Sequence, residues 1–190
     1  MEDDVSALRT ERLLLRCTLD GDLAAYREVH RDPATSTCRR AGAATPQECA
    51  DRVSESVHRW DDVGLDYWTV VERLTGDILG FGGLRPDNGE LNMYFRFRPS
   101  AWGYGYAYEM ARAAISWSAR HRPDEPVVIW TQPANSAALR LSERVGFVRD
   151  GSRETDGYVE WSFRAPEARP AGEAKDAGAA VLDARTGIDA

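Results

Sequence analysis

Two glycines in the segment PSAWGYGYAYEM (99–110) offer the clearest chemistry in this sequence. Gly103 and Gly105 alternate with aromatic residues, after an apolar run and before an alanine-rich helical pattern. Backbone N–H groups in the first turn of a helix lack intrahelical acceptors, and glycine lets an anion approach them without a Cβ in the way. The segment therefore fits a cradle for an anionic ligand. A tight turn packed by aromatic side chains explains the same residues, and both interpretations stay open at this point.

Two common phosphate-binding patterns do not fit this segment. A P-loop has a lysine directly after its last glycine, whereas Tyr106 follows Gly105 here, and the only lysine in the chain is Lys175. A dinucleotide-binding fold alternates parallel strands with helices. Residues 67–97 instead predict three consecutive antiparallel strands joined by turns. The glycine segment therefore belongs to another kind of arrangement.

A second segment, NSAALRLSERVGF (135–147), places an asparagine eleven residues before a Gly-Phe dipeptide. Asn135 is suited to the N-cap of a helix, and Gly146 is suited to the left-handed residue that follows its end. Asn135 can be a plain cap, or its amide can also bind a ligand. The two roles are compatible, so the sequence predicts the helix without choosing between them.

Hydrophobic periodicity and turn residues predict the elements that position these segments. Thr45 and Glu48 have the spacing of a capping box. Gly80, Gly82 and Gly83 within one strand indicate a bulge or the close approach of another backbone. The expected helices begin at Asp20, Thr45, the glycine segment and Asn135, and the expected strands cover 9–17, 67–74, 78–85, 91–97 and 127–131, with one more beginning at Phe147 and a last one at 158–163.

Length and composition limit the classes of function. We expect one domain over residues 1–165 and a flexible tail over 166–190, which are rich in alanine, glycine, proline and charge. A net charge of −7 argues against nucleic acid as a partner, and no apolar run approaches the roughly 18 residues of a membrane span. The acidic N-terminus is not typical of a signal peptide. Cys17, Cys38 and Cys49 lack metal-site spacing, so we expect a cytoplasmic protein with no metal.

The order of these motifs resembles that of the GNAT N-acetyltransferases. WGYGYA places Gly103 and Gly105 at the two glycine positions of the family and Ala107 at the opening of the helix. TERLLLR and TGDILGFGGLR are similar to the Rim-type branch, the ribosomal-protein N-terminal acetyltransferases, and the resemblance covers about residues 8–163. It implies an α+β fold in which helices flank a mostly antiparallel central sheet with two splayed parallel strands.

The resemblance also implies a reaction and a set of binding residues. Acetyl-CoA would be the co-substrate, and its acetyl group would pass to a primary amine, on a protein N-terminus or a small molecule, by direct attack in a ternary complex. Family members are monomers or homodimers, and we expect one of these states. The implied cofactor-binding residues are Phe95, Arg96, Phe97, Trp102, Gly103, Tyr104, Gly105, Tyr106, Ala107 and Asn135.

Departures from the family pattern affect the acid and the base. The family often has a glutamate where this chain has Asn92, and the nearest carboxylate, Glu90, is the first candidate base, although a solvated turn carboxylate explains it equally. Ala138 replaces a serine proposed as the acid in the Rim type. Ser142 lies where other members have a tyrosine, so it is either a proton donor or an ordinary helix serine. Weaker candidates for proton transfer are His30, Asp66, Tyr94 and Tyr104.

Two alternative functions fit the same motifs. The chain could be a non-catalytic acyl-CoA-binding or sensing module, which the residues Asn92 and Ala138 favour because neither can exchange protons usefully. It could also use another acyl donor such as succinyl-CoA, whose extra carboxylate would need a basic group, for which Arg96 is a candidate.

Overall fold

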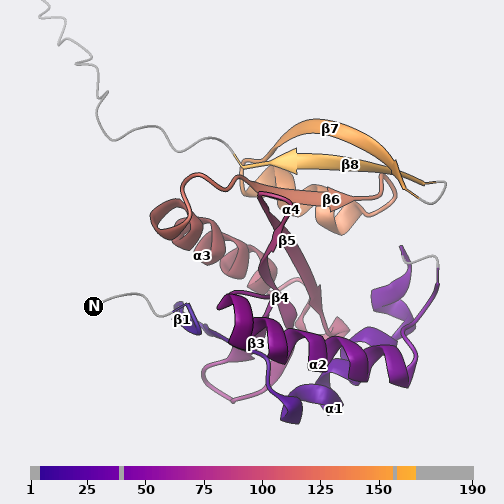
Figure 1. Ribbon diagram of the computed structural model, residues 1–190. Coiled ribbons are helices and arrows are strands. Elements are labelled where there is room, and N and C mark those ends of the chain that lie inside the picture. Colours follow the sequence, from indigo (N-terminus) through magenta and orange to yellow (C-terminus); the bar gives the residue numbers. More distant parts are fainter. Residues whose placement is uncertain (1–4, 39–40, 156–157, 166–190) are drawn as a thin grey trace, which may run out of the picture.

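An eight-stranded sheet forms the centre of the computed structural model, which describes residues 5–38, 41–155 and 158–165 (Figure 1). The predicted tail at 166–190 lies outside the described residues. The strands are β1 (Ala7–Arg9), β2 (Leu13–Arg16), β3 (Trp68–Glu72), β4 (Ile78–Asp87), β5 (Glu90–Phe97), β6 (Val127–Thr131), β7 (Val148–Thr155) and β8 (Tyr158–Arg164). The α-helices are α1 (Leu23–Arg31), α2 (Pro46–Val63), α3 (Tyr106–His121) and α4 (Ser136–Arg144), and short 3₁₀ turns cover Asp20–Asp22, Pro33–Ser36 and Pro99–Ala101.

The strands follow the order β1-β2-β3-β4-β5-β6-β8-β7, and every neighbouring pair is antiparallel except β5 and β6. The parallel pair is short: its register contains only Leu91 opposite Val127 and Asn92 opposite Val128. The remainder of β5, from residue 93 to 97, still pairs with β4 on its other side. The expected fold, with two splayed parallel strands in a mostly antiparallel sheet, is confirmed.

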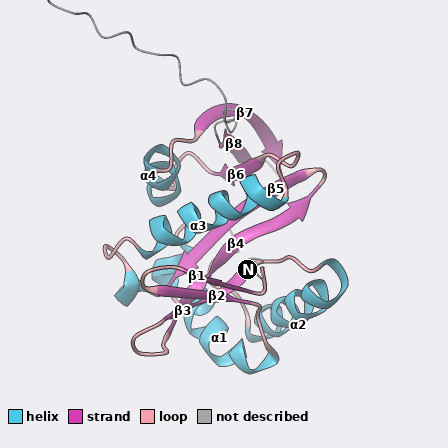
Figure 2. Ribbon diagram, turned by 90° about the vertical axis from the view of Figure 1, so that its left-hand side faces the viewer, coloured by secondary structure: helices cyan, strands magenta, loops and turns pink. Residues whose placement is uncertain are grey.

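Helices cover both faces of the long strands β4 and β5. Phe81 of β4 contacts the Tyr26 ring of α1, with centroids 4.8 Å apart. A Cβ at the next residue, Gly82, would lie 2.9 Å from the sulfur of Met110 on α3. Because neighbouring strand residues face opposite sides, α1 and α3 lie on opposite faces, and Figure 2 shows them apart across these strands. Side chains of α1 therefore meet one face of β4 and β5, and side chains of α3 meet the other.

The glycines of β4 are explained by the close approach of β5. A Cβ at Gly80 would lie 2.3 Å from the carbonyl oxygen of Arg96, and one at Gly82 would lie 2.6 Å from that of Tyr94. Gly83 has φ +126°, and an added Cβ would meet the Trp68 ring at 1.9 Å. The predicted close approach of another backbone is confirmed at Gly80 and Gly82, whereas the neighbour of Gly83 is the Trp68 side chain of β3.

The prediction of one strand over residues 9–17 is wrong. β1 and β2 form a hairpin in which Leu8 lies opposite Leu15, and the N–H of Thr10 donates to the carbonyl of Leu13 at 2.9 Å. The charged pair Glu11 and Arg12 sits in the turn. The polar residues between Leu8 and Leu13 therefore mark a turn here rather than a longer strand.

The start of α1 also differs from the expectation, because Asp22 supports it and Asp20 does not cap it. The Asp22 carboxylate accepts from the N–H of Leu19 at 2.9 Å and from both terminal nitrogens of Arg16 at 2.7 Å. A 3₁₀ turn over Asp20–Asp22 shifts the start of the helix to Leu23. In the sequence, Asp20 and Asp22 are both plausible N-cap residues. Only the contact of the buried Asp22 with Arg16 shows which of them supports the start of the helix.

The start and end of α2 agree with the prediction. The Thr45 hydroxyl accepts from the N–H of Glu48 at 3.1 Å, and the Glu48 carboxylate accepts from the N–H of Thr45 at 2.7 Å. Gly64 follows the helix with φ +71°. Within the part of the chain that the structure describes, no helix is both long and apolar enough to cross a membrane.

Candidate active site

The glycine segment forms a sharp turn between β5 and α3. Gly103 and Gly105 both have φ +82°, a left-handed conformation that other residues adopt at a cost, and Gly105 is the N-cap of α3. Among the described residues, no backbone acceptor receives the N–H groups of Gly103, Tyr104 and Gly105. A Cβ at Gly103 would meet no atom within 4 Å. The turn therefore presents free donors beside open space at the positive end of a helix, as an anion cradle requires.

Aromatic residues hold the turn and border it. The Trp102 indole donates to the carbonyl of Phe97 at 2.9 Å, which ties the turn to the end of β5. The side chain of Tyr106 is buried and its hydroxyl donates to Glu72 of β3. Tyr104 is 64% exposed, and its ring faces the Tyr106 ring with centroids 6.0 Å apart. The turn is thus anchored at both ends while its middle faces solvent.

A three-residue clamp, formed by Thr10, Arg12 and Glu109, joins the β1–β2 hairpin to the turn. The Glu109 carboxylate accepts from the Thr10 hydroxyl, from the N–H of Arg12 at 2.8 Å and from Arg12 Nε at 2.7 Å. Arg12 Nη1 also donates to the carbonyl of Tyr104 at 2.9 Å. The carbonyl of the turn is therefore held toward the hairpin. A Cβ at Gly105 would lie 3.7 Å from Arg12 Nη2, so the guanidinium borders the cradle.

Burial tends to raise the pKa of Glu109, but the hydrogen bonds from Thr10 and Arg12 outweigh it, and the pKa lies below its usual value. The carboxylate is therefore ionised at neutral pH. Sequence reasoning did not find this clamp, because the hairpin and the helix are almost one hundred residues apart and a single sequence carries no sign of their pairing.

The three predicted strand residues, Phe95, Arg96 and Phe97, lie on the part of β5 beyond its last pair with β6. Phe97 is buried and Phe95 packs against the core, while Arg96 lies over the Tyr94 ring at 5.8 Å. This edge of β5 runs from the point of divergence at Asn92 to the glycine turn. An extended ligand held by the turn can pair with it as an added strand does.

On α4, Asn135 is confirmed as the N-cap, since its Oδ1 accepts from the N–H of Ala138 at 3.2 Å. Ala107 is partly buried beside the core, in the first turn of α3. Ser142 is fully buried, and its hydroxyl donates to the carbonyl of Ala138 at 2.9 Å. α4 packs against α3 and β6, where the guanidinium of Arg144 lies 4.7 Å from the centre of the Tyr108 ring.

The candidate bases on β5 are already engaged. The Glu90 carboxylate accepts from Arg164 of β8 at 3.0 Å. Asn92 Nδ2 donates to the hydroxyl of Tyr67 at 2.7 Å. Glu90 and Asn92 share one face of β5 with Tyr94 and Arg96, whereas no described contact brings Ser142 to them.

Tyr67, which sequence reasoning missed, lies at the centre of this face. Its ring stands 5.0 Å from that of Tyr94, and the Arg85 guanidinium lies over it at 4.7 Å. Burial raises the pKa of Tyr67 to about 12, so its hydroxyl stays protonated at neutral pH. Asp66 is 2% exposed, and its Oδ1 lies 3.9 Å from Nε of Arg85. The face therefore combines the protonated Tyr67 hydroxyl and the Tyr94 ring with the buried Asp66 carboxylate beside Arg85.

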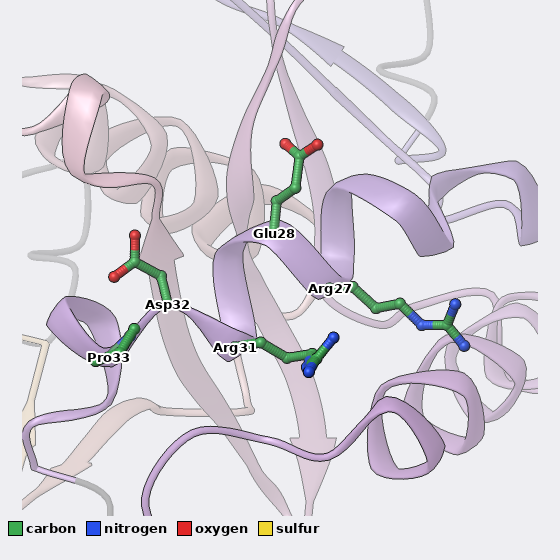
Figure 3. A pocket seen from close by; sticks show the side chains of 5 residues that line it. All are labelled: Arg27, Glu28, Arg31, Asp32 and Pro33. Atoms are coloured by element: carbon green, nitrogen blue, oxygen red, sulfur yellow. The ribbon is translucent and has the colours of Figure 1, made fainter.

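A shallow pocket on the outer surface of α1 lies apart from these groups. It is lined by Arg27, Glu28, Arg31, Asp32 and Pro33. Figure 3 shows the two carboxylates on one side of the helix and the two guanidinium groups on the other. Its charges of both signs are typical of a solvated helix surface. None of the candidate site residues described above lines it.

Comparison with known proteins agrees with this arrangement. The model of the acetyltransferase (GNAT) domain matches residues 12–148. YkkB, an uncharacterized protein of Bacillus subtilis, is 28% identical over 144 residues, which are 73% of this chain and 83% of YkkB.

Two solved structures share the fold. An acetyltransferase from Agrobacterium tumefaciens has a TM-score of 0.74 at 24% identity, over 84% of this chain and 94% of that one. The ribosomal L7/L12 α-N-protein acetyltransferase RimL, solved in complex with coenzyme A, has a TM-score of 0.67 at 15% identity, over 83% of this chain and 96% of that one. The family match runs from Arg12 through the glycine turn to the end of the Asn135 helix, and the chain belongs to the GNAT acetyltransferase family.

Proposed function

We propose that this protein transfers an acetyl group from acetyl-CoA to a primary amine, on a protein N-terminus or a small molecule. The observation that carries the proposal is the glycine turn between β5 and α3. Its free N–H groups lie at the N-terminus of α3, and the turn directly follows the part of β5 that is not paired with β6. This is the arrangement that a ligand with a pyrophosphate at one end and an amide-rich chain at the other requires. The coenzyme A complex of RimL supports the same use of the fold.

In this proposal, the backbone of residues 102–107 binds the pyrophosphate, and the pantetheine arm pairs with β5 at Phe95–Phe97. Asn135 caps α4 through Oδ1, which leaves its Nδ2 to donate to an amide of the arm. The thioester then reaches the end of the open edge near Asn92, where β5 and β6 meet. The side chains of Tyr67 and Tyr94 lie beside Asn92.

The reaction is direct attack of the neutral amine on the thioester carbonyl. The acceptor ammonium must first lose a proton, since a lysine amine has a pKa of about 10.4 and an N-terminal amine one of about 8. Glu90 is a candidate base if its bond to Arg164 is exchanged for one to water. Ser142 is a candidate donor to the departing thiolate if it leaves the carbonyl of Ala138.

The transfer is tested by release of coenzyme A thiol from acetyl-CoA. Spermidine, kanamycin and a short peptide with a free N-terminus serve as amine probes, and mass spectrometry identifies any acetylated product. We expect thiol release that depends on one of these amines. Binding of acetyl-CoA without acetylation of any amine, over extended incubation, would contradict the proposal.

A non-catalytic acyl-CoA-binding module is the second candidate, and the engaged state of both strand residues favours it. Glu90 is held by Arg164 and Asn92 by Tyr67, so neither presents a free base. This function predicts tight cofactor binding with no turnover. The same assay distinguishes it, because acetylated product excludes it.

A further inference from the structure

A histidine from α1 and a tyrosine from the sheet form a hydrogen-bonded pair on the Asn92 face of β5. His30 of α1 is 5% exposed, and its Nδ1 lies 3.0 Å from the carbonyl oxygen of Tyr26. A carbonyl can only accept, so Nδ1 carries the hydrogen, and Nε2 of the neutral ring must be an acceptor. Nε2 lies 3.0 Å from the hydroxyl of Tyr94, which therefore donates to it.

The imidazole is held in one orientation by its neighbours. Its ring stacks on that of Tyr26 with centroids 3.7 Å apart and planes 5° apart, and Phe81 of β4 lies 5.7 Å away. The carbonyl fixes the tautomer while the stacked ring fixes the plane. This is the way in which a base is oriented toward a hydroxyl in nucleophile and relay systems.

Tyr94 occupies the position on β5 where a reacting group is needed. It follows the last residue paired with β6, Asn92, by two positions and shares its face. Gly83 of β4 lies opposite Tyr94 in the register and has no side chain to cover its ring. Tyr67 lies beside it at 5.0 Å. The Tyr94 hydroxyl thus connects the buried imidazole to the end of the open edge.

We propose that His30 and Tyr94 form the proton relay that deprotonates the acceptor amine, an inference that rests on the proposed function. The ammonium gives a proton to the Tyr94 oxygen as the phenolic proton passes to Nε2 of His30. The N–C bond then forms at the thioester carbonyl, the C–S bond breaks, and the thiolate takes the second proton of the amine nitrogen. His30 returns its proton to solvent, and Tyr94 ends the cycle as it began.

Charged and titratable groups from two further elements act on Tyr26, the ring stacked on His30, and they are Cys49 and Arg52 on α2 and Tyr94 and Arg96 on β5. Unlike Glu90, whose carboxylate is held by Arg164, the imidazole already has its acceptor atom directed at a hydroxyl on the reacting face.

The test combines kinetics with NMR on the full chain. Tyr94→Phe and His30→Gln should lower kcat about 100-fold with the most active of the three amine probes, with the KM for acetyl-CoA within about twofold of the wild type. His30→Gln should also flatten the acidic limb of the pH profile. His58→Gln is the matched control, because His58 makes the same contact to a carbonyl four residues earlier, Ser54, on the exposed side of α2.

Nitrogen NMR of the imidazole tests the relay independently of turnover. We expect His30 in the Nδ1–H tautomer, with an Nε2 resonance that shifts in Tyr94→Phe. Variants that keep more than about a third of wild-type kcat and its pH profile overturn the relay, and so does an imidazole in the other tautomer. A wild type that acetylates none of the amines would overturn the proposed function and the relay with it, whereas an active wild type with unaffected variants overturns the relay alone.

Discussion

The clamp between Glu109 and the β1–β2 hairpin should contribute both to stability and to cofactor binding. Glu109→Gln keeps the size of the side chain but removes the charge that accepts from Thr10 and from two nitrogens of Arg12. Its amide group also places a donor beside a donor of Arg12. Hydrogen bonds to a charged group contribute about 1.5–3 kcal/mol, against about 1 kcal/mol for neutral ones.

The expected loss is about 2 kcal/mol in the free energy of unfolding. The Glu109 side chain is 16% exposed, so solvent weakens its hydrogen bonds only slightly. Arg12 is 42% exposed, so its bonds to Glu109 contribute toward the lower end of this range. For a domain of this size, about 2 kcal/mol corresponds to a fall in Tm of about 4–8 °C. Since the clamp also holds the carbonyl of Tyr104, acetyl-CoA affinity should fall by up to about tenfold.

The effect should depend on pH in a defined direction. The pKa of Glu109 is lower in the folded protein than its ordinary value of 4.5, so its stabilisation is present above that value and is lost as the pH falls through the folded pKa. The difference in Tm between wild type and Glu109→Gln should therefore stay constant from pH 7 down to about pH 5 and shrink as the pH falls below 4.5.

Glu160→Gln is the matched control for the clamp. Glu160 accepts from Arg153 at 2.8 Å on the β7–β8 hairpin, with exposures of 24% and 47% that resemble those of the clamp. Thermal unfolding and calorimetric titration with acetyl-CoA would be measured on both variants. Equal losses of stability and equal affinities in the two variants would refute the reasoning.

Substitutions at three further positions test other parts of the structure. Asp22→Asn removes the buried partner of Arg16 and should cost about 3 kcal/mol in urea unfolding, and a loss below about 1 kcal/mol would contradict the importance of this pair. Asn135→Ala should cost about 1 kcal/mol as a lost N-cap, whereas Asn135→Asp should keep the cap and lose acetyl-CoA affinity, and equal affinity in Asn135→Asp and wild type would exclude the amide contact. Glu90→Gln should lower turnover at neutral pH more than cofactor affinity, and unchanged turnover would remove Glu90 from the mechanism.

The strand and helix pattern was largely predictable because local signals agree with the fold. The capping box at Thr45, the left-handed Gly64 and the cap at Asn135 each act within a few residues, so the sequence contains all that is needed to recognise them. The hairpin at residues 7–16 was missed because its turn, which includes Glu11 and Arg12, contains no glycine, proline, asparagine or aspartate to mark it.

The turn at residues 102–105 was predictable for the same reason, since glycine is the residue type that favours the left-handed conformation of Gly103 and Gly105. The proton-transfer groups were not, because they depend on contacts between distant elements. His30 and Tyr94 are 64 residues apart and meet only when α1 packs on β5. Glu90 looked free in the sequence because Arg164, its partner, lies on the last strand.

The central claim is that the glycine turn binds acetyl-CoA, and calorimetric titration of Gly103→Ala tests it most directly. An alanine at φ +82° should cost about 1–2 kcal/mol in stability and move the backbone N–H groups of the turn. Gly64→Ala, at φ +71° with equally open space, should have a similar cost at the end of α2, away from the turn. We predict micromolar binding of acetyl-CoA and none of ATP by the wild type and by Gly64→Ala, with at least about a tenfold loss in Gly103→Ala. Equal affinity in the two variants, or no binding by the wild type at millimolar acetyl-CoA, would contradict the claim.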